Sequence, residues 1–266
     1  MQETKTIILA AGKKTRIQSD LPKVLHTVAG RPMIEHSIER ARAGGVGEIA
    51  VVVGYGADEV EAAVGGPDVR FFRQVEQHGT GHAVVQVKPF LEGFDGNVVV
   101  LYGDMPLLLP DTIRALADTR DTTGAAGVVL TIELENPPAF GRIVRDGAGR
   151  VTRMVEARDA TAAELAIKEV NVGAYCFDTA ALLWALDRLR DDNEQHEYYL
   201  TDVIEILVDG GHAVETVVAR TLEETLGVND VVHLAFAEKL GDIQYAESMY
   251  ELIDAAAAME RDTHRD

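Results

Sequence analysis

The first half of the chain alternates short apolar runs with longer amphipathic segments. The apolar runs are rich in Val and Ile and almost continuously hydrophobic, which is typical of strands that a parallel sheet buries on both faces. They predict five strands, at Thr6–Ala10, Ile49–Val53, Val69–Phe72, Asn97–Tyr102 and Ala126–Thr131.

Helical patterns lie between these runs. Pro32 suits the first position of a helix. Apolar residues follow it at helical spacing, at Ile34, Ile38 and Ala41. Asp58 is expected to cap a helix over Glu59–Val64, and Pro110 to open another that reaches Thr119. The alternation predicts an α/β fold with a doubly wound, mostly parallel, Rossmann-like sheet, whose ligands bind at the carboxyl ends of the strands.

The pattern changes after Pro137, where shorter strands and tight turns predict a small antiparallel subregion over about residues 137–220. Its expected strands are Ile143–Arg145, Val151–Val155, Val170–Phe177 and Val214–Val218, and its expected helices are Leu182–Leu189 and Leu200–Val208. From Asp230 to about Met259 apolar residues recur at helical spacing. We therefore expect a main domain over residues 1–229 and a helical extension over residues 230–266. The apolar stripe around Met249, Leu252 and Ile253 makes a homodimer one expected assembly.

Composition narrows the class of protein. The chain has 266 residues, 25 basic and 44 acidic, and a formal net charge of −19, which argues against a nucleic-acid partner. No apolar run approaches the ~20 residues of a membrane span, and Glu3 and Lys5 interrupt any signal-peptide core. The single cysteine, Cys176, lies in an apolar run and cannot form an intrachain disulfide. These features predict a cytoplasmic protein with no membrane partner.

A group of cations follows the first predicted strand. Gly12 ends that strand, and the basic residues that follow are Lys13, Lys14, Arg16 and Lys23. On so acidic a chain, this group predicts a small polyanion held by backbone N–H groups and fixed cations. The alternative interpretation is a solvated turn rich in Lys and Arg. The segment matches neither G-x-G-x-x-G nor G-x-x-x-x-G-K-[ST].

Two further residues suit a metal ion. Asp104 follows the apolar run Val98–Leu101, where a hard oxygen ligand would suit Mg²⁺ shared with substrate phosphates. The alternative for Asp104 is the cap of a turn. Asn229, taken alone, reads as the N-cap of the helix that starts near Asp230. His78 and His82 are four residues apart, but the glycines around them argue against a helical zinc pair.

The pattern L-A-A-G-x-x-T-R from Leu9, followed by L-P-K ending at Lys23, resembles the signature of the sugar-phosphate nucleotidyltransferases. Within that family the chain is most similar to the uridylyltransferase domains of the bacterial bifunctional enzymes that make UDP-N-acetylglucosamine. The resemblance runs from about Thr6 to about Leu234. Further matching segments are Gln74–Ala83, Tyr102–Asp104, Phe140–Val144, Val155–Glu156, Val170–Gly173, Glu197–Asp202 and Gly227–Asn229.

The resemblance implies a set of site residues and two substrates, UTP and a sugar 1-phosphate, here N-acetylglucosamine 1-phosphate. It implies that Arg16 and Lys23 are catalytic, and that Asp104 and Asn229 hold Mg²⁺. The implied nucleotide-binding residues are Leu9, Ala10, Ala11, Gly12, Gln74, Gly79, Thr80, Tyr102 and Gly103. The implied sugar-binding residues are Gly141, Glu156 and Asn171.

The chain departs from the resembled family in two ways. Lys14 stands where the family usually has Gly, and Ile17 where it usually has Met, so the geometry around the triphosphate is open to change. The hexapeptide repeats that carry acetyl transfer in the bifunctional relatives do not occur, so that activity is not expected. Alternative functions are nucleotidyl transfer with glucose 1-phosphate or dTTP, and a regulatory module that binds a nucleotide sugar without turnover. A dinucleotide-dependent dehydrogenase would fit the predicted fold, but this chain lacks the G-x-G-x-x-G motif of that class.

Overall fold

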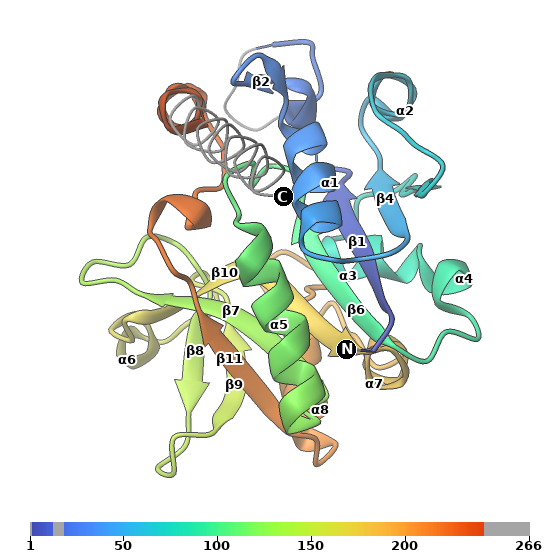
Figure 1. Cartoon of the computed structure of the whole chain (residues 1–266). Coiled ribbons are helices and arrows are strands. Elements are labelled where there is room, and N and C mark those ends of the chain that lie inside the picture. Colours follow the sequence, from blue (N-terminus) through green and yellow to red (C-terminus); the bar gives the residue numbers. More distant parts are fainter. Residues whose placement is uncertain (1, 13–18, 242–266) are drawn as a thin grey trace, which may run out of the picture.

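The computed structural model describes residues 2–12 and 19–241 of the chain. These residues form a nine-stranded mixed sheet with helices on both faces, and a separate two-stranded ribbon (Figure 1). The strands of the main sheet are β1 (Thr4–Ala10), β4 (Ile49–Val53), β5 (Val69–Arg73), β6 (Asn97–Tyr102), β7 (Gly127–Glu133), β8 (Arg142–Arg145), β9 (Val151–Val155), β10 (Glu169–Asp178) and β11 (Val214–Val218). The ribbon pairs β2 (Thr27–Val28) with β3 (Arg31–Pro32).

Parallel pairing dominates along the main path of the sheet. Its strand order is β11-β7-β10-β6-β1-β4-β5, and β10 runs antiparallel to both of its neighbours. The hairpin of β8 and β9 adds to β10 at one end. The expected doubly wound, mostly parallel α/β fold with a small antiparallel part is therefore confirmed. The antiparallel strands are continuous with the main sheet, because β10 is long enough to pair with β6, β7 and β8.

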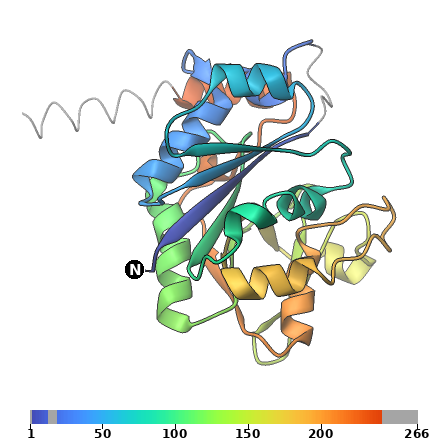
Figure 2. The same ribbon diagram turned by 90° about the vertical axis from the view of Figure 1, so that its right-hand side faces the viewer.

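Helices cover both faces of this sheet, as the side view in Figure 2 shows. One face carries α1 (Met33–Ala43), α2 (Ala57–Ala63) and α5 (Pro110–Thr123). The other face carries α3 (Thr80–Val85), α4 (Lys88–Leu91), α7 (Thr179–Leu186) and α8 (Asp202–Asp209). Adjacent residues of β1 serve opposite faces, since Ile7 packs with the second group of helices and Ile8 with the first. Burial on both faces explains why β1 is hydrophobic throughout.

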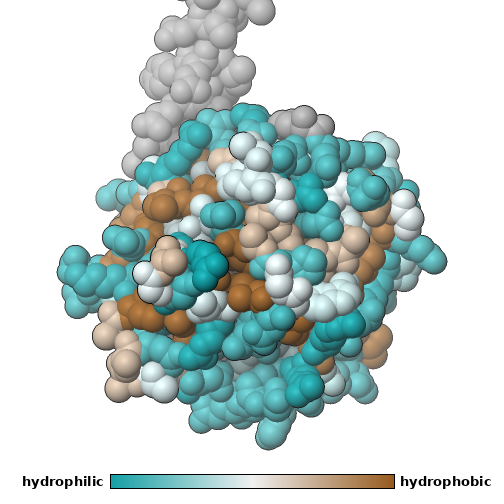
Figure 3. All heavy atoms as spheres, turned by 90° about the horizontal axis from the view of Figure 1, so that it is seen from below, coloured by the Kyte–Doolittle hydropathy of each residue, from teal (hydrophilic) through white to brown (hydrophobic). Residues whose placement is uncertain are grey.

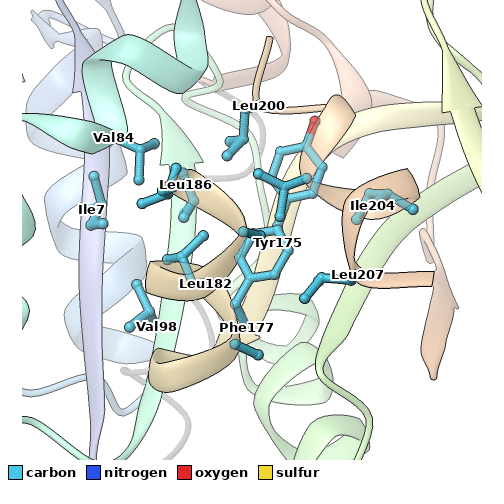
Figure 4. Close-up of a cluster of buried hydrophobic side chains, with 14 of the residues drawn as sticks. Ile7, Val84, Val98, Tyr175, Phe177, Leu182, Leu186, Leu200, Ile204 and Leu207 are labelled. Carbon is cyan, nitrogen blue, oxygen red and sulfur yellow. The ribbon is translucent and has the colours of Figure 1, made fainter. Parts of the chain in front are cut away.

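Tyr175 and Phe177 of β10 lie at the centre of the cluster beneath α7 and α8 (Figure 4). Their rings are stacked, with centroids 5.8 Å apart, and both side chains are fully buried. The two residues are two positions apart on one strand and therefore point to the same face of the sheet. In Figure 4 the hydroxyl of Tyr175 lies at the edge of the cluster on the side of Leu200.

The register of the parallel strands brings several predicted site residues to one edge of the sheet. Leu9 pairs with Tyr102, and the N–H of Gly103 donates to the carbonyl of Leu9 at 2.9 Å. At the next strand end, the N–H of Gln74 donates to the carbonyl of Val53 at 2.8 Å. The segments that follow β1, β5 and β6 therefore all leave the sheet at its carboxyl edge.

Four predicted helix starts differ from the structure. The helix expected at Leu200–Val208 is α8, which begins at Asp202. Asp58 does not cap α2, because Gly56 stands at its N-cap with a φ of 63° and Asp58 pairs with Arg73 at 2.5 Å. Pro32 stands one residue before α1, in an extended conformation at the N-cap. The helix expected at Leu182–Leu189 begins at Thr179, because the Asp178 carboxylate caps it by accepting from the Ala181 N–H at 2.9 Å. The 3₁₀ turns η1 (Lys23–Leu25) and η2 (Glu223–Thr225) and the helix α6 (Ala162–Leu165) complete the list of elements.

Residues 231–241 are helical. The rest of the predicted extension, with the dimer contact expected around Met249, Leu252 and Ile253, lies outside the described residues. In the part of the chain that is described, no helix is both long and apolar enough to cross a membrane. The face seen in Figure 3 is mainly hydrophilic at its periphery, with hydrophobic groups nearer its centre.

Candidate active site

A cavity of about 510 Å³ opens at the carboxyl edge of the sheet. Most of the predicted catalytic, nucleotide-binding and metal-binding residues line it: Leu9, Ala10, Ala11, Gly12, Lys23, Gln74, Gly79, Thr80, Tyr102, Asp104 and Asn229. Gly103 does not line the cavity, but its hydrogen bond to Leu9 fixes the turn that carries Asp104. Arg16 and Lys14 lie outside the described residues. We call this space the nucleotide cavity.

Ala11 and Gly12 form part of the wall of the nucleotide cavity. A Cβ atom added at Gly12 would meet no other atom within 4 Å among the described residues, so the backbone there is open to close approach. Lys23 enters from the turn η1, and Val24 of the same turn also lines the cavity. An exposed glycine backbone beside a fixed ammonium suits a phosphate group.

Lys23, Asp104 and Asn229 form a cluster at the centre of the site. The Lys23 ammonium contacts the Asp104 carboxylate and lies 2.7 Å from Asn229 Oδ1. The N–H of Val228 donates to the carbonyl of Asp104 at 2.9 Å, which ties the two acceptor residues together. The Lys23 and Asp104 side chains keep 15% and 18% of their exposure, so the cluster is reachable yet largely dry. Two hard oxygen atoms therefore converge on one cation.

Gln74 and the start of α3 form another part of the wall of the nucleotide cavity. Gly79 has a φ of 101°, and a Cβ atom there would lie 2.6 Å from the Tyr198 carbonyl oxygen, so only glycine fits. Gly81 donates its N–H to the same carbonyl at 2.7 Å. The Thr80 Oγ1 atom accepts from the N–H of Leu200 at 3.0 Å. These bonds hold the loop before α3 rigidly against residues 198–200.

Gln74 is only 3% exposed, and its side-chain amide is held by two partners. Its Nε2 atom lies 3.0 Å from the Gly79 carbonyl oxygen and 3.0 Å from His82 Nδ1. A carbonyl can only accept, so the Gln74 atom beside it is the amide nitrogen, and His82 Nδ1 is then an acceptor. Burial, followed by the charge of His78, lowers the pKa of His82 and favours this neutral form. Both amide hydrogens are thus used, and Gln74 Oε1 is left to accept from a ligand.

A second, smaller cavity of about 240 Å³ adjoins the first and shares Tyr102, Asp104 and Asn229 with it. The three predicted sugar-binding residues, Gly141, Glu156 and Asn171, all line it. We call this space the sugar cavity. The structure therefore brings the predicted nucleotide and sugar residues to two spaces that meet at the Lys23 cluster.

Glu156 and Asn171 are both fixed by protein hydrogen bonds. Thr201 Oγ1 donates to Glu156 Oε1 at 3.1 Å, and burial raises the pKa of Glu156 above its usual range. The Asn171 N–H donates to the carbonyl of Gly141 at 2.9 Å, so the two sugar-lining strands are joined. These are acceptors and donors of the kind that bind sugar hydroxyl and amide groups.

A larger cavity, of about 780 Å³, lies on the other side of Glu156. Its lining mixes carboxylates such as Asp159 and Asp202 with Arg153 and Arg188. Arg188 stacks on the ring of Trp184 at 4.2 Å from the ring centroid. Lys23, Asp104 and Asn229 do not line this larger space.

A comparison with protein families decides the class. The model of the MobA-like NTP transferase domain matches residues 6–195. The chain belongs to the MobA-like NTP transferase family. The chain is therefore a nucleotidyltransferase.

Curated relatives of this NTP transferase are bifunctional GlmU proteins. That of Geobacillus sp. (strain WCH70) is 47% identical over 234 residues, which is 88% of this chain and 51% of the relative. Those of Brevibacillus brevis and Burkholderia thailandensis are each 48% identical, over 90% and 91% of this chain and 51% and 53% of the relatives. The chain thus spans about half the length of the curated relatives it matches.

A solved structure, that of UDP-glucose pyrophosphorylase complexed with UDP-glucose, is similar in fold to this NTP transferase. The TM-score is 0.75 at 16% sequence identity, over 92% of this chain and 99% of the other. At this identity the likeness concerns the fold alone.

Several residues that line or hold the site were not assigned a role from the sequence. Gln77 and Glu197 line the nucleotide cavity, Thr201 holds Glu156, and Tyr175 contacts Asn171. They lie in or beside the matching segments, so their proximity to the motifs was the available signal. In the described part of the chain, no three His, Cys, Asp or Glu side chains gather to hold a metal, so any ion here would take few protein ligands.

Proposed function

We propose that this NTP transferase moves the uridylyl group of UTP onto N-acetylglucosamine 1-phosphate, giving UDP-N-acetylglucosamine and pyrophosphate. The observation that carries the proposal is the junction of the nucleotide and sugar cavities at the Lys23, Asp104 and Asn229 cluster. The 47% and 48% identity with GlmU proteins, over 88% and 90% of this chain, supports the choice of base and sugar. We assign the reaction to residues 1–229, with sugar recognition in about residues 137–220.

The reaction forms a bond between a phosphate oxygen of the sugar phosphate and the α-phosphorus of UTP. The bond from that phosphorus to the oxygen bridging to the β-phosphate breaks, and pyrophosphate leaves. The attacking phosphate has a second pKa of about 6, so it is already an anion near neutral pH and needs no general base. The enzyme must instead offset anion–anion repulsion and align the two substrates.

Lys23 offsets the repulsion between the two anionic substrates, because its ammonium lies at the junction of the cavities. There it can stabilise the negative charge that develops on the departing phosphate oxygens. Gly12 contributes to the alignment of the substrates, because its open backbone lets phosphate approach the end of β1. Arg16 is assigned the leaving pyrophosphate through the family resemblance and lies outside the described residues.

Asp104 and Asn229 fit a Mg²⁺ ion, which we include in the proposal. Their oxygens already converge on one cation, the Lys23 ammonium, and a carboxylate with an amide oxygen is a hard donor set. Two protein ligands leave room for waters and substrate phosphates, as Mg²⁺ requires. When bound, the ion would neutralise charge on the phosphates.

Gln74 is assigned the base and Asn171 the sugar. Uracil carries an N3–H donor, and Gln74 Oε1 is the acceptor left after its amide hydrogens have bonded within the protein. Asn171 and Glu156 offer donors and acceptors to the sugar in the adjoining cavity. A buried acceptor rejects a base that presents an acceptor in the same place, because both groups would then lose a partner.

The test is a panel of UTP, CTP and dTTP against N-acetylglucosamine 1-phosphate and glucose 1-phosphate, read by pyrophosphate release and product mass. We expect the UTP and N-acetylglucosamine 1-phosphate pair to give the highest kcat/KM, and Mg²⁺ to be required. A preference for dTTP or glucose 1-phosphate would contradict the substrate assignment. Tight binding of UDP-N-acetylglucosamine without pyrophosphate release from any pair would favour a regulatory module.

A further inference from the structure

The Asn171 side chain, which lines the sugar cavity, is held on both sides. Its Oδ1 atom accepts from the N–H of Gly173 at 3.0 Å, and its Nδ2 atom donates to the Tyr175 hydroxyl at 2.7 Å. The first bond identifies the oxygen of the amide and the second its nitrogen, so the two bonds select one orientation. The second Nδ2 hydrogen and the second Oδ1 lone pair remain for a ligand.

Tyr175 itself lines neither cavity. Its side chain is fully buried in the cluster beneath α7 and α8, stacked on Phe177, and its hydroxyl lies at the edge of that cluster (Figure 4). Phe177 performs the same packing on the same face of the strand without a hydroxyl. The oxygen of Tyr175 is therefore not needed for packing, and a buried hydroxyl is costly unless it is bonded.

An irregularity in β10 makes the Asn171–Tyr175 contact possible. Residues four apart in a regular strand are separated by about 13 Å. At that distance the short side chain of Asn171 would not be expected to reach the Tyr175 hydroxyl. The register between β10 and β7 shifts between Asn171 and Tyr175, and Gly173 within that shift has a φ of 96°. Bulges of this kind re-aim a side chain.

We propose that Tyr175 is a positioning residue for sugar recognition, whose hydroxyl orients the Asn171 amide toward the sugar 1-phosphate. The proposal rests on the function proposed above and adds a residue outside the cavities to it. Because an amide nitrogen only donates, the Tyr175 oxygen must accept from Asn171, and its own proton is free for another acceptor.

The Tyr102 hydroxyl is the partner available for that proton. Tyr102 and Tyr175 act on each other electrostatically, and Thr80 of the nucleotide cavity acts on Tyr102. The ring of Tyr102 lies against the bulge, since a Cβ atom at Gly173 would be 3.0 Å from its Cε2 atom. Desolvation raises the pKa of both phenols and keeps them protonated. The orientation of Asn171 is thus fixed by a neutral Tyr175 hydroxyl.

The first test follows the Asn171 side-chain amide by ¹⁵N NMR in the wild type and in Tyr175→Phe, without substrates. We expect the Nδ2 hydrogens to shift and to exchange faster with solvent in the variant, because one of them loses its acceptor. This measurement does not depend on the enzymatic reaction. An unchanged Asn171 amide in Tyr175→Phe would overturn the proposal.

The second test measures KM for both substrates in Tyr175→Phe, Asn171→Ala and the double variant. We expect Tyr175→Phe to raise KM for N-acetylglucosamine 1-phosphate about fivefold to tenfold and to change KM for UTP less than twofold. In the Asn171→Ala background, Tyr175→Phe should have no further effect, because a positioning residue acts through its partner. An equal effect in both backgrounds would contradict the proposal.

Phe177→Leu serves as the matched control, since it weakens the same cluster without removing a hydroxyl. It should lower the Tm and leave both KM values unchanged. If Phe177→Leu raised KM for the sugar phosphate as much as Tyr175→Phe does, loss of packing would explain the result instead. Absence of turnover in the wild type would refute the proposed function, while the NMR experiment would still decide whether Tyr175 orients Asn171.

Discussion

The ammonium of Lys23 lies 2.7 Å from Oδ1 of Asn229, although the two residues are 206 positions apart in the sequence. The same ammonium contacts Asp104, so three segments contribute to one charged cluster. Lys23 comes from the turn after β1, Asp104 from the turn after β6, and Asn229 from the segment before the C-terminal helix. The sheet brings the first two together because β1 and β6 are parallel neighbours.

Lys23→Ala should lower kcat/KM for uridylyl transfer by about 10²-fold or more, because a fixed cation beside the phosphates acts most strongly in the transition state. Arg16→Ala is expected to have a similar effect. Steady-state pyrophosphate release measures the loss, and circular dichroism checks the fold. Lys88→Ala is the matched control, since Lys88 pairs with Asp187 at the surface and lines neither cavity. Near wild-type turnover in Lys23→Ala would exclude Lys23 from the mechanism.

Asp104→Asn should weaken the dependence on Mg²⁺ and the activity together. The amide keeps the size of the carboxylate and removes its charge, so the affinity for a hard cation falls. Titrating Mg²⁺ into the activity assay should give a higher half-saturating concentration, and Mn²⁺ binding followed by electron paramagnetic resonance should weaken in parallel. Asp111→Asn, which changes an exposed acid at the start of α5, provides the control. A variant with unchanged Mn²⁺ affinity would rule out Asp104 as a ligand.

His82→Leu should raise KM for UTP by about fivefold and leave KM for the sugar phosphate unchanged. Gln74 would lose one of the two acceptors that fix its amide, which is worth about 1 kcal/mol for a neutral hydrogen bond. The preference for UTP over CTP should fall with it. His78→Leu is the control, because the His78 ring lies beside His82 but does not bond Gln74.

Lowering the pH should reduce the preference of the wild type for UTP over CTP, as His82→Leu is expected to do. The pKa of His82 is lowered, so its proton is taken up below the usual histidine range, and Nδ1 then becomes a donor that opposes the Gln74 amide. The ratio of kcat/KM for UTP to that for CTP cancels the titration of the shared phosphates. That ratio should decline in the wild type as the pH falls below the usual histidine range, and stay flat in His82→Leu. A flat profile in both proteins would contradict the role of His82.

The sequence predicted the fold well because both kinds of element have a local signature. The strand at Ile49–Val53 agrees with β4 residue for residue, since a continuous apolar run needs no partner to be recognised. The start of α2 was wrong because Gly56 in a left-handed conformation replaced the expected Asp58 cap. A glycine in a sequence is not a specific signal for the start of a helix, and only the backbone conformation shows that Gly56 precedes one.

Some residues of the candidate site could be predicted from the sequence, and others could not. Asp104 and Gly12 were identified because each lies in the turn that follows a strand, and the strand is visible in the sequence itself. Tyr175 and His82 were not, because their relevance depends on which atoms the bulge in β10 and the loop before α3 bring within 3 Å of Asn171 and Gln74. Such contacts form only in the folded chain, and the hydrophobic periodicity of the sequence does not predict them.

Asp202→Asn should stabilise the protein at alkaline pH and have little effect in acid. Asp202 opens α8 and lines the large cavity beyond Glu156. Burial, followed by the negative charges of Glu156 and other nearby acids, raises the pKa of Asp202 to about 7. Since an unfolded Asp titrates at about 3.9, the native state holds more protons than the unfolded state between these two values. The free energy of unfolding contributed by this group therefore decreases as the pH rises through that window.

Thermal unfolding of the wild type and Asp202→Asn across this range measures the effect. The Tm of the variant should exceed that of the wild type at about pH 8, and the difference should shrink toward zero by about pH 4, where Asp202 is protonated in both states. Asp209→Asn removes an exposed acid from the other end of the same helix and should not reproduce this pH dependence. A Tm difference that does not vary with pH would mean that Asp202 is charged throughout, and that the N-terminus of α8 stabilises its carboxylate more than burial among acids disfavours it.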